Sequence, residues 1–338
     1  MKKLNIIIII IIILLLIQCN LAENSNNNDK TDKKTEKEEE RNDYREDMRN
    51  FVEDISSYAR SKYTDFIIIP QNAHDLITKN GEISGLSVIS YLNAINGLGR
   101  EELFYGYEDD DEMVEINRSN SMIVFLDLAL AYGKKILVTD YCSTQYKIDD
   151  SYSNNNSKGY ISFAADSREL DRIPFYPVNP YNENSLNITT LSMARNFLYL
   201  INPSNYDSKS DFLNAIRQTN YDMVIIDLFF DDTKELTAED VLSLKTKQNG
   251  GTRLIIAYMS IGEAEAYRYY WQPEWEKKPP LWLIEENPDW PENYKVKYWD
   301  KQWQEIIYGN DNSYLRKILN AGFDGVYLDL VDAYEYFE

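Results

Sequence analysis

Six carboxylates lie within or just after three short apolar runs in the C-terminal third of the chain. Residues at the carboxyl ends of neighbouring parallel strands meet at one edge of a sheet or barrel, so acids in these positions are expected to share one site. Charges on a merely solvated face would not follow strand ends in this way, although one of these acids could instead pair with Arg268 or cap a helix. The acids are Asp227, Asp231, Glu263, Glu265, Asp329 and Asp332.

Other chemically versatile side chains are scarce. His74 is the sole histidine, which excludes an HExxH zinc site and disfavours a Ser-His-Asp triad. Cys19 and Cys142 are the two cysteines, so neither a disulfide framework nor a CxxC metal spacing is present. Acid–base chemistry therefore falls to Asp and Glu, with Tyr and Lys as lesser candidates, and no cofactor or metal is predicted.

Clustered carboxylates suit more than one function. In glycoside hydrolysis, one carboxyl group protonates the leaving oxygen and another acts as nucleophile or base. Several oxygens could instead hold a hard cation, here among Asp227, Glu263 and Asp329, in a metal-dependent lyase or hydrolase. A carbohydrate-binding protein without turnover is the third possibility. Because histidine is scarce and the N-terminus resembles an export signal, we favour glycoside hydrolysis.

All six tryptophans fall between residues 271 and 303. This segment is a long insertion between the runs 254–260 and 325–331, and it is predicted to form a lid or wall beside the acids. Tryptophan rings present flat apolar faces with a polar edge, which suits stacking on sugars. At least half of these rings are nevertheless expected to form a small core inside the insertion.

Eight short β-branched runs recur at the spacing of β/α units. Amphipathic helical segments separate several of them, and most lack strict alternation, as is typical of parallel strands covered on both faces. Eight units over this length predict a (β/α)8 TIM barrel in the α/β class. The alternative is an open doubly wound sheet, but the sequence has no GxGxxG turn to support it. The runs are 66–70, 91–95 (with 102–107 as a rival), 135–141, 160–165, 196–202, 223–230, 254–260 and 325–331.

The order of these elements suggests a circular permutation. Residues 46–61 form a predicted amphipathic helix with no strand before it, and the run 325–331 has no helix after it. A closed barrel can join such orphan elements, because its first and last units are neighbours. Residues 174–193, rich in Asn and Pro, are predicted to be the linker between the original termini. The alternative is a C-terminal truncation behind an unrelated N-terminal domain.

The N-terminus carries predicted export signals. Residues 1–18 combine a basic start with an apolar run too short to span a bilayer, as in a signal peptide. LIQC at 16–19 resembles a lipobox, which predicts lipidation of Cys19 and an exported protein held on a membrane. Residues 19–44 are almost devoid of apolar side chains and are predicted to be a disordered tether. An uncleaved signal anchor is the alternative.

The net charge of −21 limits the choice of partners. Such a field repels nucleic acid and disfavours polyanionic substrates, so no nucleic-acid partner is predicted. Neutral or cationic substrates remain compatible with it.

Three long segments resemble glycoside hydrolase family 114, the endo-α-1,4-polygalactosaminidase-like TIM-barrel proteins. They are AYMSIGEAEAYRYYW (257–271), YKVKYWDKQWQEII (294–307) and GFDGVYLDLVDAYEYF (322–337). Segments 58–72, 95–106, 133–141 and 159–170 resemble the part expected to follow them. Residues 45–338 are thus predicted to be one domain in which 45–173 resembles the C-terminal half of the family and 194–338 its N-terminal half.

The resemblance implies roles for individual residues. Asp329 would be the nucleophile and Glu101 the general acid, with the adjacent Glu102 as a rival. Glu101 reaches the site only if the run 91–95, rather than 102–107, is the strand. The implied activity is an exported, lipid-anchored hydrolase of an amino-sugar polysaccharide that uses no cofactor. Asp227, Glu263 and Arg268 match positions that are implied to bind substrate. Asn72 and Asp332 are further candidates for binding at the same edge.

Overall fold

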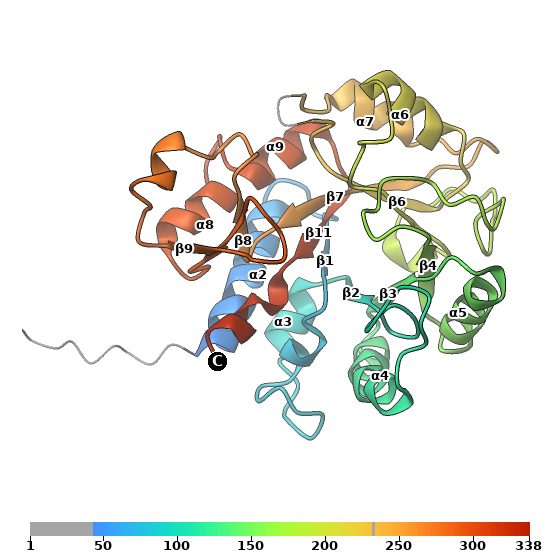
Figure 1. Cartoon of the computed structure of the whole chain (residues 1–338), viewed down its shortest axis with the longest axis horizontal. Coiled ribbons are helices and arrows are strands. Elements are labelled where there is room, and N and C mark those ends of the chain that lie inside the picture. The colour runs from blue at the N-terminus through green and yellow to red at the C-terminus, as the bar shows by residue number, and fades with distance from the viewer. Residues whose placement is uncertain (1–42, 232–233) are drawn as a thin grey trace, which may run out of the picture. The chain divides into compact units, whose positions relative to one another are not determined.

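The computed structural model describes residues 43–231 and 234–338, and its core consists of parallel strands (Figure 1). Five strands form one sheet in the order β5-β6-β7-β11-β1, and three form another in the order β2-β3-β4. The predicted α/β class with a parallel core is confirmed. The ladders formed by the described residues do not pair β4 with β5. The eight strands are β1 (Ile67–Pro70), β2 (Gly97–Glu101), β3 (Lys135–Tyr141), β4 (Ile161–Ala165), β5 (Leu198–Tyr199), β6 (Met223–Ile226), β7 (Leu254–Ser260) and β11 (Gly325–Asp329).

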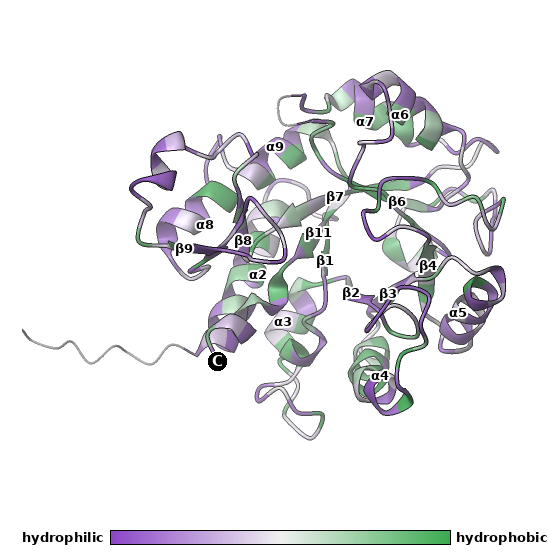
Figure 2. Cartoon of the chain, viewed as in Figure 1, coloured by the Kyte–Doolittle hydropathy of each residue, from purple (hydrophilic) through white to green (hydrophobic). Residues whose placement is uncertain are grey.

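Helices follow or precede most of these strands, and their inner faces carry the hydrophobic residues (Figure 2). The helix predicted over 46–61 is α2. The capping box predicted at Thr237 is present, since its side chain accepts from Asp240 N while the Asp240 carboxylate accepts from Thr237 N. The α-helices are α2 (Tyr44–Arg60), α3 (Ile89–Ala94), α4 (Ile116–Ala131), α5 (Gln145–Ser157), α6 (Lys209–Arg217), α7 (Ala238–Leu244), α8 (Lys301–Ile307) and α9 (Tyr314–Ala321).

The second strand was wrongly predicted. Residues 91–95 lie mostly in helix α3, and residues 102–107 form a loop, so neither candidate run is a strand. The strand is β2, whose sequence GLGRE contains two glycines. A Cβ on Gly99 would lie 2.1 Å from the Tyr327 hydroxyl, so close packing inside the core requires glycine there. The fifth strand is also shorter than the predicted 196–202, since β5 contains two residues.

The first and last strands of the chain are neighbours. Strand β1 pairs in parallel with β11, with Ile67 opposite Gly325 and Pro70 opposite Leu328. Helix α2 contacts the C-terminal part of the chain, where Tyr298 donates a hydrogen bond of 2.7 Å to the Tyr44 carbonyl. The adjacency that the permutation requires is therefore present, while the permutation itself stays a prediction.

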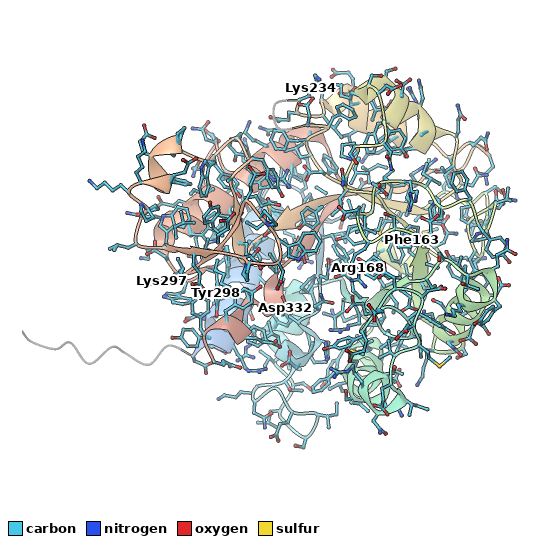
Figure 3. The ribbon with its side chains drawn as sticks, viewed as in Figure 1. Phe163, Arg168, Lys234, Lys297, Tyr298 and Asp332 are labelled. Carbon is cyan, nitrogen blue, oxygen red and sulfur yellow. The ribbon has the colours of Figure 1, made fainter. Side chains whose placement is uncertain are left out.

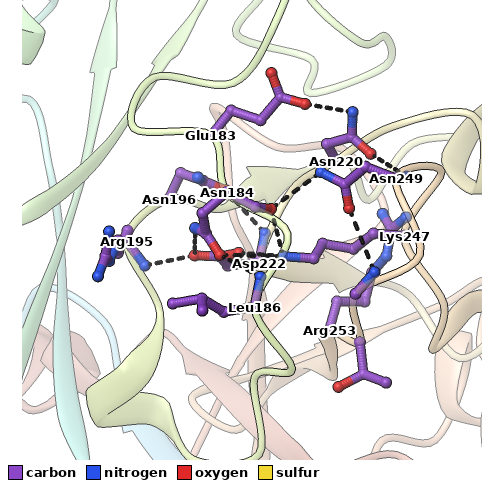
Figure 4. A network of polar contacts seen from close by, with 12 residues as sticks. Glu183, Asn184, Leu186, Arg195, Asn196, Asn220, Asp222, Lys247, Asn249 and Arg253 are labelled. Carbon is purple, nitrogen blue, oxygen red and sulfur yellow. Dashed lines mark hydrogen bonds and ion pairs between the residues drawn. The ribbon is translucent and has the colours of Figure 1, made fainter.

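The predicted linker contains no strand or α-helix, and a buried network fixes it to the start of β6 (Figure 4). Lys247 donates to the Asp222 carboxylate at 2.9 Å, and both side chains are fully buried. Asn184 of the linker donates to the other oxygen of the same carboxylate at 2.8 Å. A buried charge is costly unless it is paired and hydrogen-bonded, so this network anchors the segment at the end of the sheet opposite the acids.

The tryptophan-rich insertion carries a small antiparallel sheet in the order β8-β10-β9. Four of its tryptophans form a chain of ring contacts, from Trp271 through Trp275 and Trp282 to Trp303, with centroids 5.0–5.2 Å apart. The prediction that at least half would form a core within the insertion is confirmed. The strands are β8 (Glu263–Glu265), β9 (Leu283–Glu286) and β10 (Asn293–Val296).

Tyr44 belongs to the folded part rather than to the predicted tether, because it begins α2 and its ring packs on Trp299 and Phe337. The predicted signal peptide, Cys19 and residues 20–42 lie outside the described residues. Within the described ranges, no helix is both long and apolar enough to cross a membrane.

Candidate active site

A cavity of about 1070 Å³ opens at the carboxyl ends of the strands. Figure 3 labels Asp332, beyond β11, and Arg168, beyond β4, which both line it. Every residue predicted for the catalytic or binding site lies on its wall, so the structure brings the predicted set together. These residues are Asn72, Glu101, Asp227, Glu263, Arg268, Asp329 and Asp332.

Strand register explains how Asp329 and Glu101 come to face one cavity. Strand β1 lies between β11 and β2, because Gln71 N donates to the Leu328 carbonyl at 2.9 Å and Asn72 N donates to the Gly99 carbonyl at 2.9 Å. The contact between Gly99 and Tyr327 shows that both positions face the interior. Side chains alternate along a strand, so the residues two positions further on, Glu101 and Asp329, face the interior as well.

Asp329 sits in a buried environment with two hydrogen-bond donors. Tyr258, on the neighbouring strand β7, donates to one carboxylate oxygen at 2.6 Å, and Leu330 N donates to the other at 2.8 Å. Burial raises the pKa of Asp329, and these two donors oppose the rise because they stabilise the ionised form. The group is thus held in one orientation, with its charge partly stabilised.

Glu101 ends strand β2 and is held by a different set of donors. The Tyr141 hydroxyl and the Gln71 amide donate to its carboxylate, and the Asn72 amide donates at 3.3 Å. The side-chain oxygen Oδ1 of Asn72 accepts from Glu101 N at 3.1 Å, and Asn72 has the left-handed φ of 62°. Burial raises the pKa of Glu101, and the negative charge of Asp329 raises it further. A carboxyl group in this position keeps its proton to higher pH than usual, as a general acid requires.

Glu102 points to a different partner. Its carboxylate pairs with Arg168 at 2.5 Å, and Arg168 also pairs with Asp110 at 2.6 Å. The Arg168 guanidinium lies 4.2 Å from the centroid of the Tyr141 ring. Glu102 is absent from the described wall of the cavity, whereas Glu101 is on it. Of the two rivals, Glu101 therefore has the geometry expected of the acid.

Arg268 organises a second cluster on the same wall. Its guanidinium donates two hydrogen bonds to the Asp227 carboxylate, at 2.8 and 2.6 Å, and two to Glu265, at 2.6 and 3.2 Å. All three residues are buried. Burial raises the pKa of Asp227, and the Arg268 charge opposes the rise. Asp227 and Glu265 thus pair with Arg268, which was the alternative considered for one of the acids, and both still line the cavity.

Glu263 and Asp332 complete the acidic wall. Asn287 donates to Glu263 at 2.9 Å and Tyr336 donates to the same oxygen at 3.3 Å. Asp332 lies in the 3-10 helix Val331–Tyr336, and no other residue of the described ranges donates a hydrogen bond to its carboxylate. Burial, followed by the charge of Asp329, raises the pKa of Asp332 to about 7.

A cation site among these acids is not preformed. Within residues 43–231 and 234–338, no group of three His, Cys, Asp or Glu side chains is placed to hold a metal ion. The carboxylates of Asp227, Glu263 and Asp329, which the metal hypothesis brings together, instead accept hydrogen bonds from Arg268, Asn287 and Tyr258, respectively.

Sequence reasoning missed the tyrosines that hold the two central acids. Tyr258 donates to Asp329 and Tyr141 donates to Glu101. Because the chain has 27 tyrosines, residue type alone did not single out these two. Their positions carried a usable signal, because each lies at or near the carboxyl end of a correctly predicted strand. Gln71, next to the predicted Asn72, was missed for a similar reason.

The parallel α/β core carries two partly buried, hydrogen-bonded carboxyl groups on one cavity, and glycoside hydrolysis requires such a pair. Residues 198–338, in the C-terminal part of the chain, match the model of glycoside-hydrolase family GH114. The matched region includes strands β5 to β11 and Asp329, whereas Glu101 lies outside it.

Three curated relatives are uncharacterized proteins. One from Methanocaldococcus jannaschii is 41% identical over 181 residues, which cover 52% of this chain and 49% of the relative. One from Deinococcus radiodurans is 43% identical over 123 residues, covering 36% of this chain and 37% of the relative. One from Thermotoga maritima is 39% identical over 123 residues, covering 36% of each. The chain therefore spans about half or less of the relatives it matches.

Proposed function

We propose that this protein hydrolyses an α-linked, galactosamine-type polysaccharide with Asp329 and Glu101 as its two catalytic carboxyl groups. The observation that carries the proposal is that these residues, from strands on either side of β1, line one cavity and differ in their environment. The match to the GH114 model supports glycosidase chemistry in general.

The two environments assign different roles. Glu101, whose pKa is raised by burial and by the charge of Asp329, donates its proton to the glycosidic oxygen as the bond to the anomeric carbon breaks. Asp329, whose carboxylate is supported by Tyr258 and Leu330 N, attacks the anomeric carbon or takes the proton of an attacking water. If Asp329 attacks, water then cleaves the glycosyl–Asp329 bond and gives its proton back to Glu101. If Asp329 instead takes the proton of the attacking water, it passes that proton to solvent while Glu101 regains one from solvent.

The charge of the cavity supports a neutral or cationic sugar. Among the described residues, nine carboxylates line it, against two arginines. Both arginines are already paired, Arg168 with Glu102 and Asp110, and Arg268 with Asp227 and Glu265. A polysaccharide bearing free amines would supply the missing positive charge, whereas a polyanion would be repelled.

The decisive assay measures new reducing ends from de-N-acetylated polygalactosamine. We expect the wild type to cleave it and Asp329→Asn to lose at least about 10³-fold in kcat, because the substitution removes a group that acts on the reacting atoms. Asp311→Asn is the matched control, since the side chain of Asp311 is almost fully exposed and does not line the cavity. Cleavage that survives Asp329→Asn would remove Asp329 from the mechanism. Binding of the polymer without new reducing ends would favour a carbohydrate-binding protein.

We also propose that the two sheets form one closed (β/α)8 barrel. A parallel bridge between Gln71 and Gly99 supports the junction of β1 with β2. At the other junction, Ile201 N and Asn202 N donate to the Leu170 carbonyl, which links the segment after β5 to the segment after β4. A crystal structure in which β4 and β5 diverge would contradict closure.

Export and lipid anchoring are proposed from the sequence alone. A cell that makes this chain should incorporate labelled palmitate into it, and Cys19→Ser should abolish that incorporation and release the protein from membranes. Membrane attachment that persists in the Cys19→Ser variant would favour the uncleaved signal anchor.

A further inference from the structure

Trp290 differs from the other five tryptophans of the insertion. Its side chain is exposed by 51% and lines the cavity, in the loop between β9 and β10. The other five rings each pack against another aromatic ring, whereas no described aromatic ring contacts that of Trp290. Aromatic rings contribute most when their faces are covered, so an uncovered ring on a cavity wall is available to a ligand.

Hydrogen bonds within the loop hold the backbone of Trp290 in place. Asn287 N donates to the Asn293 carbonyl at 2.7 Å, and Asn293 N donates to the Trp290 carbonyl at 3.2 Å. Within the turn, Asp289 N donates to the Asn287 side chain at 3.0 Å. A ligand that stacks on a ring with a fixed backbone pays little of the entropy otherwise needed to order a loop.

The same loop is connected to the acidic wall. The Asn287 side chain donates to Glu263 at 2.9 Å, so the turn carrying Trp290 is tied directly to a carboxylate of the cavity. The cavity of about 1070 Å³ lies at the upper end of the range for small-molecule sites, about 300–1,000 Å³, and has room for more than one sugar ring.

We infer that Trp290 is a stacking platform for a sugar ring of the bound chain, at a subsite apart from the ring whose bond is cleaved. The C–H face of a pyranose lies against the indole face, while the neighbouring carboxylates face its polar groups. The inference rests on the proposed function and deepens it, because it makes Trp290 a residue that determines which chain lengths bind well. It binds substrate without acting on the reacting atoms.

The test compares Trp290→Ala, Trp290→Phe and Leu281→Ala. Leu281 belongs to the same insertion and is 88% exposed, but it does not line the cavity. With de-N-acetylated polygalactosamine, Trp290→Ala should raise KM about tenfold and leave kcat nearly unchanged. Trp290→Phe should recover part of the loss because it keeps a flat ring, and Leu281→Ala should match the wild type. The loss should shrink with the shortest oligomer that is cleaved.

A second arm separates this inference from the proposed function. Binding of the same polymer is measured by calorimetry in the Asp329→Asn background, with and without Trp290→Ala. If the wild type cleaves the polymer and Trp290→Ala changes neither KM nor affinity, the platform is overturned and the proposed function stands. A polymer that binds through Trp290 but is not cleaved by the wild type would support the platform and overturn the proposed function. If the wild type neither binds nor cleaves the polymer, both are overturned.

Discussion

Each of the two central carboxyl groups, Glu101 and Asp329, has a second acid close by in the sequence. These second acids, Glu102 and Asp332, differ in their partners. Beside Glu101, the carboxylate of Glu102 is neutralised by Arg168 at 2.5 Å. Beside Asp329, the carboxylate of Asp332 receives no hydrogen bond from another described residue, and the charge of Asp329 helps to raise its pKa to about 7. The second acid is therefore paired with an arginine on the Glu101 side, whereas on the Asp329 side it has no ion-pair partner among the described residues and the charge of Arg100 only partly offsets the rise in its pKa.

This difference suits a division of labour. A general acid must keep its proton, which burial and the charge of Asp329 favour at Glu101, whereas the adjacent Glu102 is held in an ion pair with Arg168. The group that faces the anomeric carbon must be ionised, and a negative region that lacks an ion-pair partner favours the positive charge that develops on the sugar ring. The comparison teaches that the neighbours of the acids, rather than the acids alone, distinguish the two halves of the site.

The largest effect is expected from a matched pair of substitutions on the Glu101 side. Glu101→Gln should lower kcat about 10²–10⁴-fold on the polysaccharide, because it removes the proton donor while keeping the size of the side chain. Glu102→Gln should cost far less, since it breaks only the ion pair with Arg168. Both variants are assayed for reducing ends on the same polymer.

A substrate with a good leaving group sharpens this comparison. An aryl glycoside of galactosamine needs little protonation, so Glu101→Gln should recover much of its lost rate on it. If Glu102→Gln is the more damaged variant on the polymer, the roles of the two residues must be exchanged.

The same two halves differ in how far the sequence predicted them. Asp329 follows an apolar run, GVYL, that any periodicity analysis identifies as a buried strand, and the matching family region includes it. Glu101 ends GLGRE, which has little apolar character, because Gly99 is required by the ring of Tyr327 from a strand more than 200 residues away. That reason is tertiary, so local sequence could not reveal it.

Short apolar runs were the other source of error. Residues 91–95 were predicted to be a strand because Tyr91, Leu92 and Ile95 are apolar, yet helix α3 buries Tyr91 and Leu92 equally well. Period alone does not separate a buried strand from a buried helical turn over five residues. The acids at strand ends were predictable from position. The positions of Tyr258 and Tyr141 near strand ends were a signal too, but which acid each of them contacts depends on how the strands are ordered, which only the fold shows.

A medium effect is expected from Asp332→Asn on the Asp329 side. The folded-state pKa of Asp332 is raised from 3.8 to about 7, so its stabilising contribution is complete below the unfolded-state pKa and is lost as the pH rises through about 7. The variant should therefore unfold with the same free energy as the wild type at low pH. Above about pH 7 its free energy of unfolding should exceed that of the wild type by about 1–3 kcal/mol. The difference is no larger because solvent screens the charge of a partly exposed side chain.

Chemical denaturation at a series of pH values measures this difference. Asp311→Asn is the control, because its side chain is almost fully exposed and the substitution should give no gain at high pH. A constant difference between Asp332→Asn and the wild type at all pH values would show that Asp332 is not the unpaired charge, and the contrast between the two halves would be lost.

The smallest effect on activity is expected from a Tyr→Phe substitution made beside each of the two central carboxyl groups. Tyr258→Phe removes the hydroxyl that donates to Asp329, and Tyr141→Phe removes the one that donates to Glu101. A donor stabilises the ionised carboxylate, so each substitution should raise the pKa of its own partner, by about one unit. Because Asp329 must be ionised to act, Tyr258→Phe should move the acidic limb of the kcat/KM profile to higher pH. Because Glu101 must be protonated, Tyr141→Phe should move the alkaline limb to higher pH and extend activity there.

The pair of profiles tests the assignment of roles more directly than loss of activity does. The two substitutions are of the same kind, at buried tyrosines of the parallel strands β7 and β3, so loss of a hydroxyl from the packed interior is common to both profiles. What remains is which limb moves. If Tyr258→Phe shifts the alkaline limb and Tyr141→Phe the acidic one, Asp329 is the proton donor and Glu101 the ionised partner, and the comparison between the halves holds with their roles reversed. If both substitutions shift the same limb, the two carboxyl groups titrate as one coupled unit, and a division into separate acid and base halves is not how this cavity works.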